Sequence, residues 1–190
     1  MVWATSGTVT DGIAAELAEV LTGEKPPSAG IDVGWRPSTA TVLLALLGGQ
    51  GTVGQEERGP SFVLVDLPDP VERVECWASA HVDPVELKGL MPEHDRRNLV
   101  APWAVAVVDG AVAAVCETAR SAPASVEAGV WTYEPYRRQG FGAAATAAWA
   151  TLAADRTVFY STSWDNRASQ RLAHSLGLRP LGHWWWVHRG

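Results

Sequence analysis

The sequence lacks a long apolar run and a basic, apolar leader. The stretch TVLLALLGG at 41–49 is about half of the roughly 18 residues that a membrane-spanning helix needs. The first residues, MVWATSGTVTDG, have neither the basic start nor the continuous apolar segment of a secretory signal. We therefore expect a cytoplasmic protein with no membrane partner.

The sequence is also poor in basic residues and in cysteine. Its formal net charge of −6 argues against a nucleic-acid partner, because such binding relies on basic surface, and agrees with a cationic small-molecule partner. The two cysteines, Cys76 and Cys116, lie in apolar segments without CxxC spacing or a nearby histidine pattern. We expect buried thiols and no metal site.

The sequence contains enough apolar residues to form a hydrophobic core, and their spacing changes near residue 60. At 47% hydrophobic over 190 residues, it suits one domain with an appendage. Apolar spacing predicts helices at 11–23, capped by Asp11, and at 38–49, capped by Ser38. The glycine-rich segment 48–61 is typical of a mobile connection. We therefore predict an N-terminal helical extension over 1–60 and a second domain over 61–190.

From residue 61 onward, strand and helix patterns alternate. The clearest signal is a hairpin over 103–119, in which two β-branched runs flank Asp109-Gly110. The other elements are expected as follows: strands at 61–67, 125–133, 157–163 and 180–189, and helices at 69–79, 84–98, 141–154 and 165–177, the last capped by Asp165 or Asn166 and stopped by Gly177. This order predicts an α/β fold with a mixed, mostly antiparallel sheet flanked by helices. One crossover helix joins two parallel strands.

The segment YEPYRRQGFG at 133–142 places two arginines and two glycines where the helix at 141–154 begins. Helix N-termini bind phosphate readily, and glycines allow close approach to the backbone. The simplest interpretation is a solvated turn. A dinucleotide site is a second one, because 140–145 satisfies G-x-G-x-x-G/A and Asp165 follows about twenty residues later. Too little chain follows Asp165 for that fold, and the antiparallel hairpin is wrong for it.

A third interpretation is a coenzyme A cradle. Residues 137–142, RRQGFG, match the [Q/R]-x-x-G-x-[G/A] motif, and NRASQRLAHSLGL at 166–178 resembles the N-x-x-[A/S] helix of the same family. The sequence thus resembles the GNAT N-acetyltransferase superfamily, well over 100–190, by element order over 61–99, and not at all over 1–60. The proline usual in the turn would fall on Glu134, with Pro135 one place late.

The resemblance implies transfer of an acetyl group from acetyl-CoA to an amine of a small molecule or peptide. The backbone of 138–143 would hold the pyrophosphate, the strand at 125–133 would pair with the pantetheine arm, and Asn166 would hold its thiol end. The implied coenzyme-binding residues are Thr132, Tyr133, Arg137, Arg138, Gln139, Gly140, Phe141, Gly142, Ala143, Asn166 and Ser169.

An attacking ammonium group must first lose a proton, so a base is useful. Glu127 is our first choice, against the alternative of an exposed strand charge, and Glu117 is the second. The tyrosine that protonates the departing thiolate in many family members falls on Ala173 here. Ser161, Tyr160 or Ser163 could serve instead, or the thiolate leaves unaided. Tyr160 and Ser161 point to opposite faces of a strand, so at most one faces the site. We select Ser161 with Glu127 as the catalytic pair.

The replacement at Ala173 also motivates a different class of function, a non-catalytic acyl-CoA-binding regulatory module. A dinucleotide-dependent oxidoreductase is the third hypothesis. The sequence does not name the acceptor: polyamines, aminoglycoside-like compounds, other amine metabolites and basic peptides all remain open. The hairpin edge and the tryptophan-rich strand at 180–189 could support a homodimer.

Overall fold

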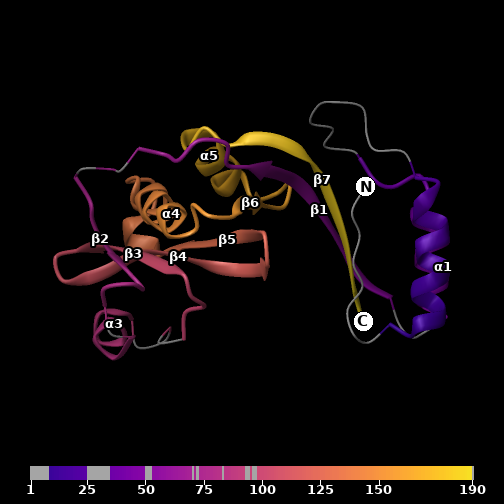
Figure 1. Ribbon diagram of the computed structural model, residues 1–190, viewed down its shortest axis with the longest axis horizontal. Helices are drawn as coiled ribbons and strands as arrows, with labels where there is room; N and C mark the ends of the chain where they lie inside the picture. The colour runs from indigo at the N-terminus through magenta and orange to yellow at the C-terminus, as the bar shows by residue number, and fades with distance from the viewer. Residues whose placement is uncertain are drawn as a thin grey trace. The chain divides into compact units, whose positions relative to one another are not determined.

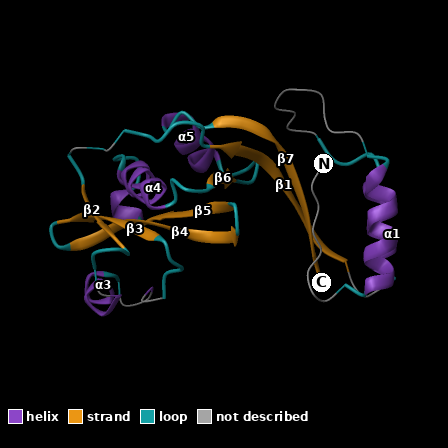
Figure 2. Ribbon diagram, in the orientation of Figure 1, coloured by secondary structure: helices purple, strands orange, loops and turns teal. Residues whose placement is uncertain are grey.

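The structure is a computed structural model that describes residues 9–24, 35–49, 53–69, 71, 73–82, 84–92, 95 and 98–189. Helices and strands alternate along the chain (Figure 2). In chain order they are α1 (Asp11–Thr22), α2 (Ala40–Gly48), β1 (Val53–Val63), β2 (Glu75–Ala78), α3 (Pro84–Leu90), β3 (Trp103–Val108), β4 (Ala111–Ala122), β5 (Ser125–Thr132), a 3-10 turn (Glu134–Tyr136), α4 (Phe141–Leu152), β6 (Thr157–Ser161), α5 (Arg167–Ser175) and β7 (Arg179–Arg189).

The strands form a seven-stranded mixed sheet in the order β2-β3-β4-β5-β6-β1-β7. Neighbours from β2 to β5 are antiparallel, β6 is parallel to β5, and β1 is antiparallel to β6. Helix α4 connects the parallel pair. This confirms the predicted fold class, the hairpin and the single crossover.

The chain divides into two compact units. The first contains residues 1–60, 162–165 and 182–190, and the second contains 61–161 and 166–181. Strands β1 and β7 each contribute residues to both. The domain boundary expected after residue 60 stays a prediction.

The core of the second unit lies on both faces of its strands, with α4 and α5 on one side and α3 on the other (Figure 1). Ala104 and Ala106 of β3 pack under α4, whereas Val105 and Val107 pack toward α3, as strand alternation requires. The alanine-rich α4 lies close to the sheet, and its Trp149 is fully buried with the indole N–H donating to the Pro102 carbonyl at 2.8 Å.

The turn and cap residues are largely as predicted. Asp109 and Gly110 both have positive φ (48° and 74°), the conformation of a primed hairpin turn. Of the two candidate caps for α5, Asn166 is the N-cap, and its Oδ1 accepts from the Ser169 amide at 3.0 Å. The caps expected for α1 and α2 were one residue out, because Thr10 and Thr39 are the N-cap residues there.

Four expected elements differ from the structure in the described residues. Much of 48–61 was read as a mobile connection but belongs to β1, which begins at Val53; residues 50–52 lie outside the described part. A Cβ on Gly59 would collide with the backbone oxygen of Thr162, so this glycine permits close packing, not flexibility. The strand expected at 61–67 ends at Val63.

The helix expected at 69–79 is instead strand β2, which pairs with β3 over Glu75–Ala78; residues 70 and 72 lie outside the described part. The helix expected at 84–98 ends at Leu90, because Pro92 disfavours helical geometry at Met91. Residues 93, 94, 96 and 97 lie outside the described part.

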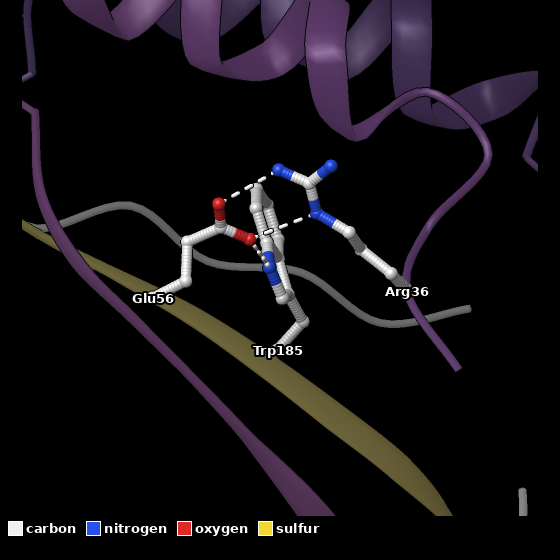
Figure 3. A network of polar contacts seen from close by, with 3 residues as sticks. All are labelled: Arg36, Glu56 and Trp185. Carbon is white, nitrogen blue, oxygen red and sulfur yellow. Dashed lines mark hydrogen bonds and ion pairs between the residues drawn. The ribbon is translucent and has the colours of Figure 1, made fainter. Parts of the chain in front are cut away.

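Two carboxylates of the first unit each accept several hydrogen bonds: the exposed Glu56 and the buried Glu24. Arg36 donates to both oxygens of Glu56 on β1 at 2.9 and 2.7 Å, and the Trp185 indole of β7 donates to the same group at 2.8 Å (Figure 3). The hydrogen bonds from Arg36, the largest influence, hold the pKa of Glu56 below its ordinary value. This network fixes segment 35–39 against the two strands.

Glu24 is the second carboxylate, and it binds the start of α2. It accepts hydrogen bonds from the amides and hydroxyls of Ser38 and Thr39 at 2.7–2.9 Å. Burial by itself would raise the pKa of Glu24, but these four bonds lower it below 4.5. Charged acceptors at a helix N-terminus stabilise it.

Substitution of Glu24 by glutamine is expected to destabilise α2 by about 1–3 kcal/mol, the range for hydrogen bonds to a charged group. Because the pKa is lower in the folded state, the stabilisation is complete above about pH 4.5 and is lost as the pH falls through the folded value. Amide hydrogen exchange in α2, measured across acid pH, tests this. The exposed Glu16 on α1 supplies the control Glu16→Gln, and equal exchange rates in the two variants would refute the role of Glu24.

Candidate active site

Strands β5 and β6 form a fork. Their parallel pairing covers Ser125–Thr157, Val126–Val158 and Glu127–Phe159. Strand β5 then continues to Thr132, whereas the remaining residues of β6 pair only with β1 on their other side among the described residues. The edge of β5 beyond Glu127 is therefore open toward β6.

The turn after β5 leads directly into the N-terminus of α4. Gly140 is the N-cap in a left-handed conformation (φ 89°), and Arg138 also has positive φ (62°). Strain of this kind in a non-glycine residue is concentrated at functional sites. The Ala144 amide donates to the Gly140 carbonyl at 3.0 Å, so the amides of Phe141, Gly142 and Ala143 precede this first helical bond. They are available, with the helix dipole, to an anion.

Gly142 permits close contact between α4 and β5. A Cβ built on this residue would lie 2.8 Å from the Thr132 Oγ1 and 3.7 Å from the Val130 Cγ1. The first of these distances is too short for a real contact. The glycine is thus required by helix–strand packing behind the turn.

The side chains of the turn are held in place by local contacts. The Arg137 Nε donates to the Thr132 carbonyl at 3.2 Å, and its guanidinium lies 5.8 Å from the centre of the Trp131 ring. The Gln139 amide donates to the Pro135 carbonyl at 3.0 Å. Such contacts preorganise a binding loop before a ligand arrives.

A cleft of about 1050 Å³ adjoins this turn. Ten of the eleven predicted coenzyme-binding residues line it, namely Thr132, Arg137, Arg138, Gln139, Gly140, Phe141, Gly142, Ala143, Asn166 and Ser169. Tyr133 does not. It is 6% exposed, packs in the core on the α3 side, and donates its hydroxyl to Asp95 at 2.8 Å.

The cleft is positively charged, since Arg137, Arg138 and Arg171 line it against a single acid, Glu134. Sequence reasoning did not select Arg171, nor Ala168, Leu172 and Ser175 beside it. All four lie on one face of α5 because they are spaced by three or four residues. That spacing, combined with the predicted Asn166 cap, could have identified them.

A second, smaller cavity of about 250 Å³ contains the two predicted catalytic residues, Glu127 and Ser161. Val126 and Ala128 pack under α4, so alternation directs Glu127 to the opposite face of the sheet. The Glu127 side chain is 15% exposed and pairs with Arg120 at 2.7 Å. The Ser161 Oγ lies 3.0 Å from the Ser61 Oγ. In the described residues, the cavity and the cleft share no lining side chain.

The other hydroxyl candidates lie elsewhere. Tyr160 is 4% exposed beneath the helices, where burial raises the pKa of its hydroxyl and Ser169 hydrogen-bonds to it. Ala173 is fully buried in the same core. Glu117, the second candidate base, accepts a hydrogen bond from the Val100 amide at 2.8 Å.

The remaining chemistry predicted from the sequence concerns thiols, metals and membranes. Cys116 is fully buried and Cys76 is partly buried, and burial raises the pKa of each thiol. Within the described ranges, no group of histidine, cysteine and acidic residues could hold a metal ion. In that same part of the chain, no helix is both long and apolar enough to span a bilayer.

Comparison with solved structures places this fold among the GNAT acetyltransferases. A putative GNAT acetyltransferase from Novosphingobium aromaticivorans superimposes with a TM-score of 0.54 at 20% identity, over 70% of this chain and 64% of that one. A GCN5-related N-acetyltransferase-like protein from Streptococcus suis gives 0.56 at 18% identity, over 78% and 66%. A GCN5-related N-acetyltransferase from Sphaerobacter thermophilus superimposes with a TM-score of 0.50 at 18% identity, over 80% of this chain and 57% of that one.

The family itself follows from the sequence profile described as "Acetyltransferase (GNAT) domain", which matches residues 57–179. The chain belongs to the GNAT acetyltransferase family. It spans about two thirds or less of the length of the solved relatives above. A search of the curated proteins found no match.

Proposed function

We propose that the protein transfers an acetyl group from acetyl-CoA to the amine of a small molecule or peptide. The observation that carries the proposal is the cleft, in which a glycine turn, a helix N-terminus and three arginines adjoin an open strand edge. Phosphates suit the amides and arginines, and an extended amide-containing chain suits the free edge of β5. Family membership supports acyl transfer as the reaction class.

In this proposal each part of the site has a separate task. Acetyl-CoA supplies a thioester, whose carbonyl carbon is open to attack by an amine. The amides of 141–143 with Arg137 and Arg138 bind phosphate, and β5 beyond Glu127 orients the chain that carries the thioester. Glu127 takes a proton from the acceptor, directly or through water, and Ser161 donates one to the departing sulfur. Most of the rate enhancement comes from positioning.

A non-catalytic acyl-CoA-binding module is the second candidate. The observation that favours it is Ala173, a fully buried residue with no hydroxyl at the position where the family's tyrosine would stand. A module of this kind would bind coenzyme A in the same cleft but would transfer no acyl group to any amine. A cytoplasmic location and a homodimer remain predictions from the sequence.

Titration with acetyl-CoA, coenzyme A and NADP tests the proposal by thermal shift and calorimetry. Ligands that bind only the native state stabilise it, by about 2.7 kcal/mol at a hundred times Kd. We expect both coenzyme A forms to raise the melting temperature and NADP, which shares the phosphates but lacks the pantetheine, to have little effect. Arg138→Gln should weaken binding about tenfold or more.

Release of free thiol in the presence of an amine panel separates the two candidates. Binding with thiol release supports the transferase, and binding without it supports the regulatory module. Absence of any response to coenzyme A would refute both.

A further inference from the structure

The cavity that contains Glu127 and Ser161 is lined by two opposite charges, Arg120 and Glu127, which form an ion pair at 2.7 Å, and the proposed function uses only the second of them. We propose that it binds the acceptor and that the acceptor is a small free amino acid, held by its carboxylate and its ammonium group at once. This inference rests on the proposed function and specifies its substrate class.

The location of the cavity suits an acceptor. Glu127 is the last residue of β5 that pairs with β6, so the cavity borders the separating strands at Glu127 and Ser161, whereas its other residues from β4 and β5 lie at the turn that joins those two strands. It lies on the face of the sheet away from α4. An amine beside Glu127 can therefore reach through the fork toward a thioester held along the open edge of β5.

The charges of the cavity match both ends of an amino acid. Arg120 and Ser121 line the cavity, and Arg156, which also pairs with Asp155 at 3.6 Å, lies 3.4 Å from the Ser121 hydroxyl. Glu127 provides the acid, paired with Arg120 at 2.7 Å. An acceptor carboxylate can take the place of Glu127 on the guanidinium, which leaves Glu127 for the ammonium. A polyamine has no carboxylate for Arg120, so an ammonium group beyond the one at Glu127 would face that guanidinium at an electrostatic cost.

The size and lining of the cavity point to a small acceptor. Its volume of about 250 Å³ lies below the usual range of roughly 300–1,000 Å³ for ligand sites. The hydroxyls of Ser61, Ser125 and Ser161 and the apolar Phe159 and Leu181 complete the wall. This space suits a free amino acid better than an aminoglycoside or a peptide chain.

The reaction balances with these residues alone. The acceptor ammonium loses one proton to Glu127, which passes it to solvent, and the amine nitrogen forms a bond to the thioester carbonyl carbon. As the carbon–sulfur bond breaks, Ser161 protonates the sulfur, and the second proton lost by the nitrogen restores the serine. The products are an N-acetyl amino acid, free coenzyme A and one proton.

The test uses the full chain with acetyl-CoA and the twenty common L-amino acids, followed by thiol release and mass spectrometry of the product. The best amino acid is compared with its amide, with the amine that lacks its carboxylate, and with spermidine. We expect kcat/KM to be at least about tenfold higher for the amino acid than for these three. Arg120→Gln should lower the ratio of kcat/KM for the amino acid to that for the amine without its carboxylate by about 10- to 100-fold, since only the amino acid has a carboxylate to bind Arg120.

The control is Arg73→Gln, an exposed arginine outside both cavities, which should change neither rate. Equal rates for an amino acid and its carboxylate-free amine, or a preference for spermidine, would overturn the amino-acid acceptor while the transferase stands. If no amine is acetylated although coenzyme A binds, the proposed function fails. Calorimetric titration of the same amino acids into coenzyme A-saturated protein then tests whether the cavity binds an amino acid. Absence of binding would overturn the inferred amino-acid site.

Discussion

Replacement of Glu127 by glutamine is expected to lower kcat for amine acetylation by about 10²–10⁴-fold, the usual contribution of a general base. Glutamine has nearly the same shape and cannot accept the proton. Glu127 lies at the fork and lines the small cavity, not the cleft, so the Kd for coenzyme A should change by less than about twofold. Steady-state kinetics across pH and calorimetry with coenzyme A measure the two effects separately.

The second candidate base, Glu117, provides a comparison that shows which of the two glutamates acts as the base. Glu117 accepts a hydrogen bond from the Val100 amide, so Glu117→Gln should affect stability more than kcat. A larger loss of kcat in Glu117→Gln than in Glu127→Gln would show that the base was assigned to the wrong strand. A loss that an added small carboxylate buffer restores in Glu127→Gln, but not in Glu117→Gln, would strengthen the assignment.

Substitution of Gly142 by alanine is expected to weaken coenzyme A binding about tenfold or more and to destabilise the protein by about 1–3 kcal/mol, as overpacking does. The added Cβ would lie 2.8 Å from the Thr132 Oγ1, so either this side chain or α4 must shift, and we expect α4 to move with the amides of its first turn. Calorimetry with coenzyme A and thermal unfolding measure the two losses.

A compensating change tests this physical cause. Thr132→Ala removes the atom that the new methyl group would meet, so Gly142→Ala with Thr132→Ala should recover most of the binding that Gly142→Ala loses. Gly89→Ala is the matched control, because a Cβ there has nothing within 4 Å and alanine has the higher helix propensity. If the double variant binds no better than Gly142→Ala, the close helix–strand contact is not what Gly142 provides.

Local sequence patterns predicted most of the secondary structure of the second unit. The hairpin at Asp109-Gly110, the alanine-rich α4 and the Asn166 cap each depend on neighbouring residues, and all three were predicted. Ten of the residues selected for coenzyme binding also line one cleft, because most of them follow one another through the turn before α4. Tyr133 was misplaced relative to the cleft, since alternation along β5 directs it into the core.

The errors occurred where distant partners decide the conformation. Strand β1 is rich in glycine and charge, so by itself it resembles a loop, and only its neighbours β6 and β7 make it a strand. Strand β2 depends in the same way on pairing with β3. The Arg120–Glu127 pair joins two strands, and nothing in the local pattern of either residue indicates it.

The division of the chain between its two units has a consequence for synthesis on the ribosome. The unit that contains α1 and α2 also contains residues 162–165 and 182–190, so the polypeptide passes between the units several times. Residues 9–24 and 35–49 emerge early, but the β7 residues that carry Trp185 to Glu56 are translated after the whole acetyltransferase core. The hydrogen bond between Trp185 and Glu56 can therefore form only after that core has been synthesised, so the first unit completes its contacts last although its helices are made first.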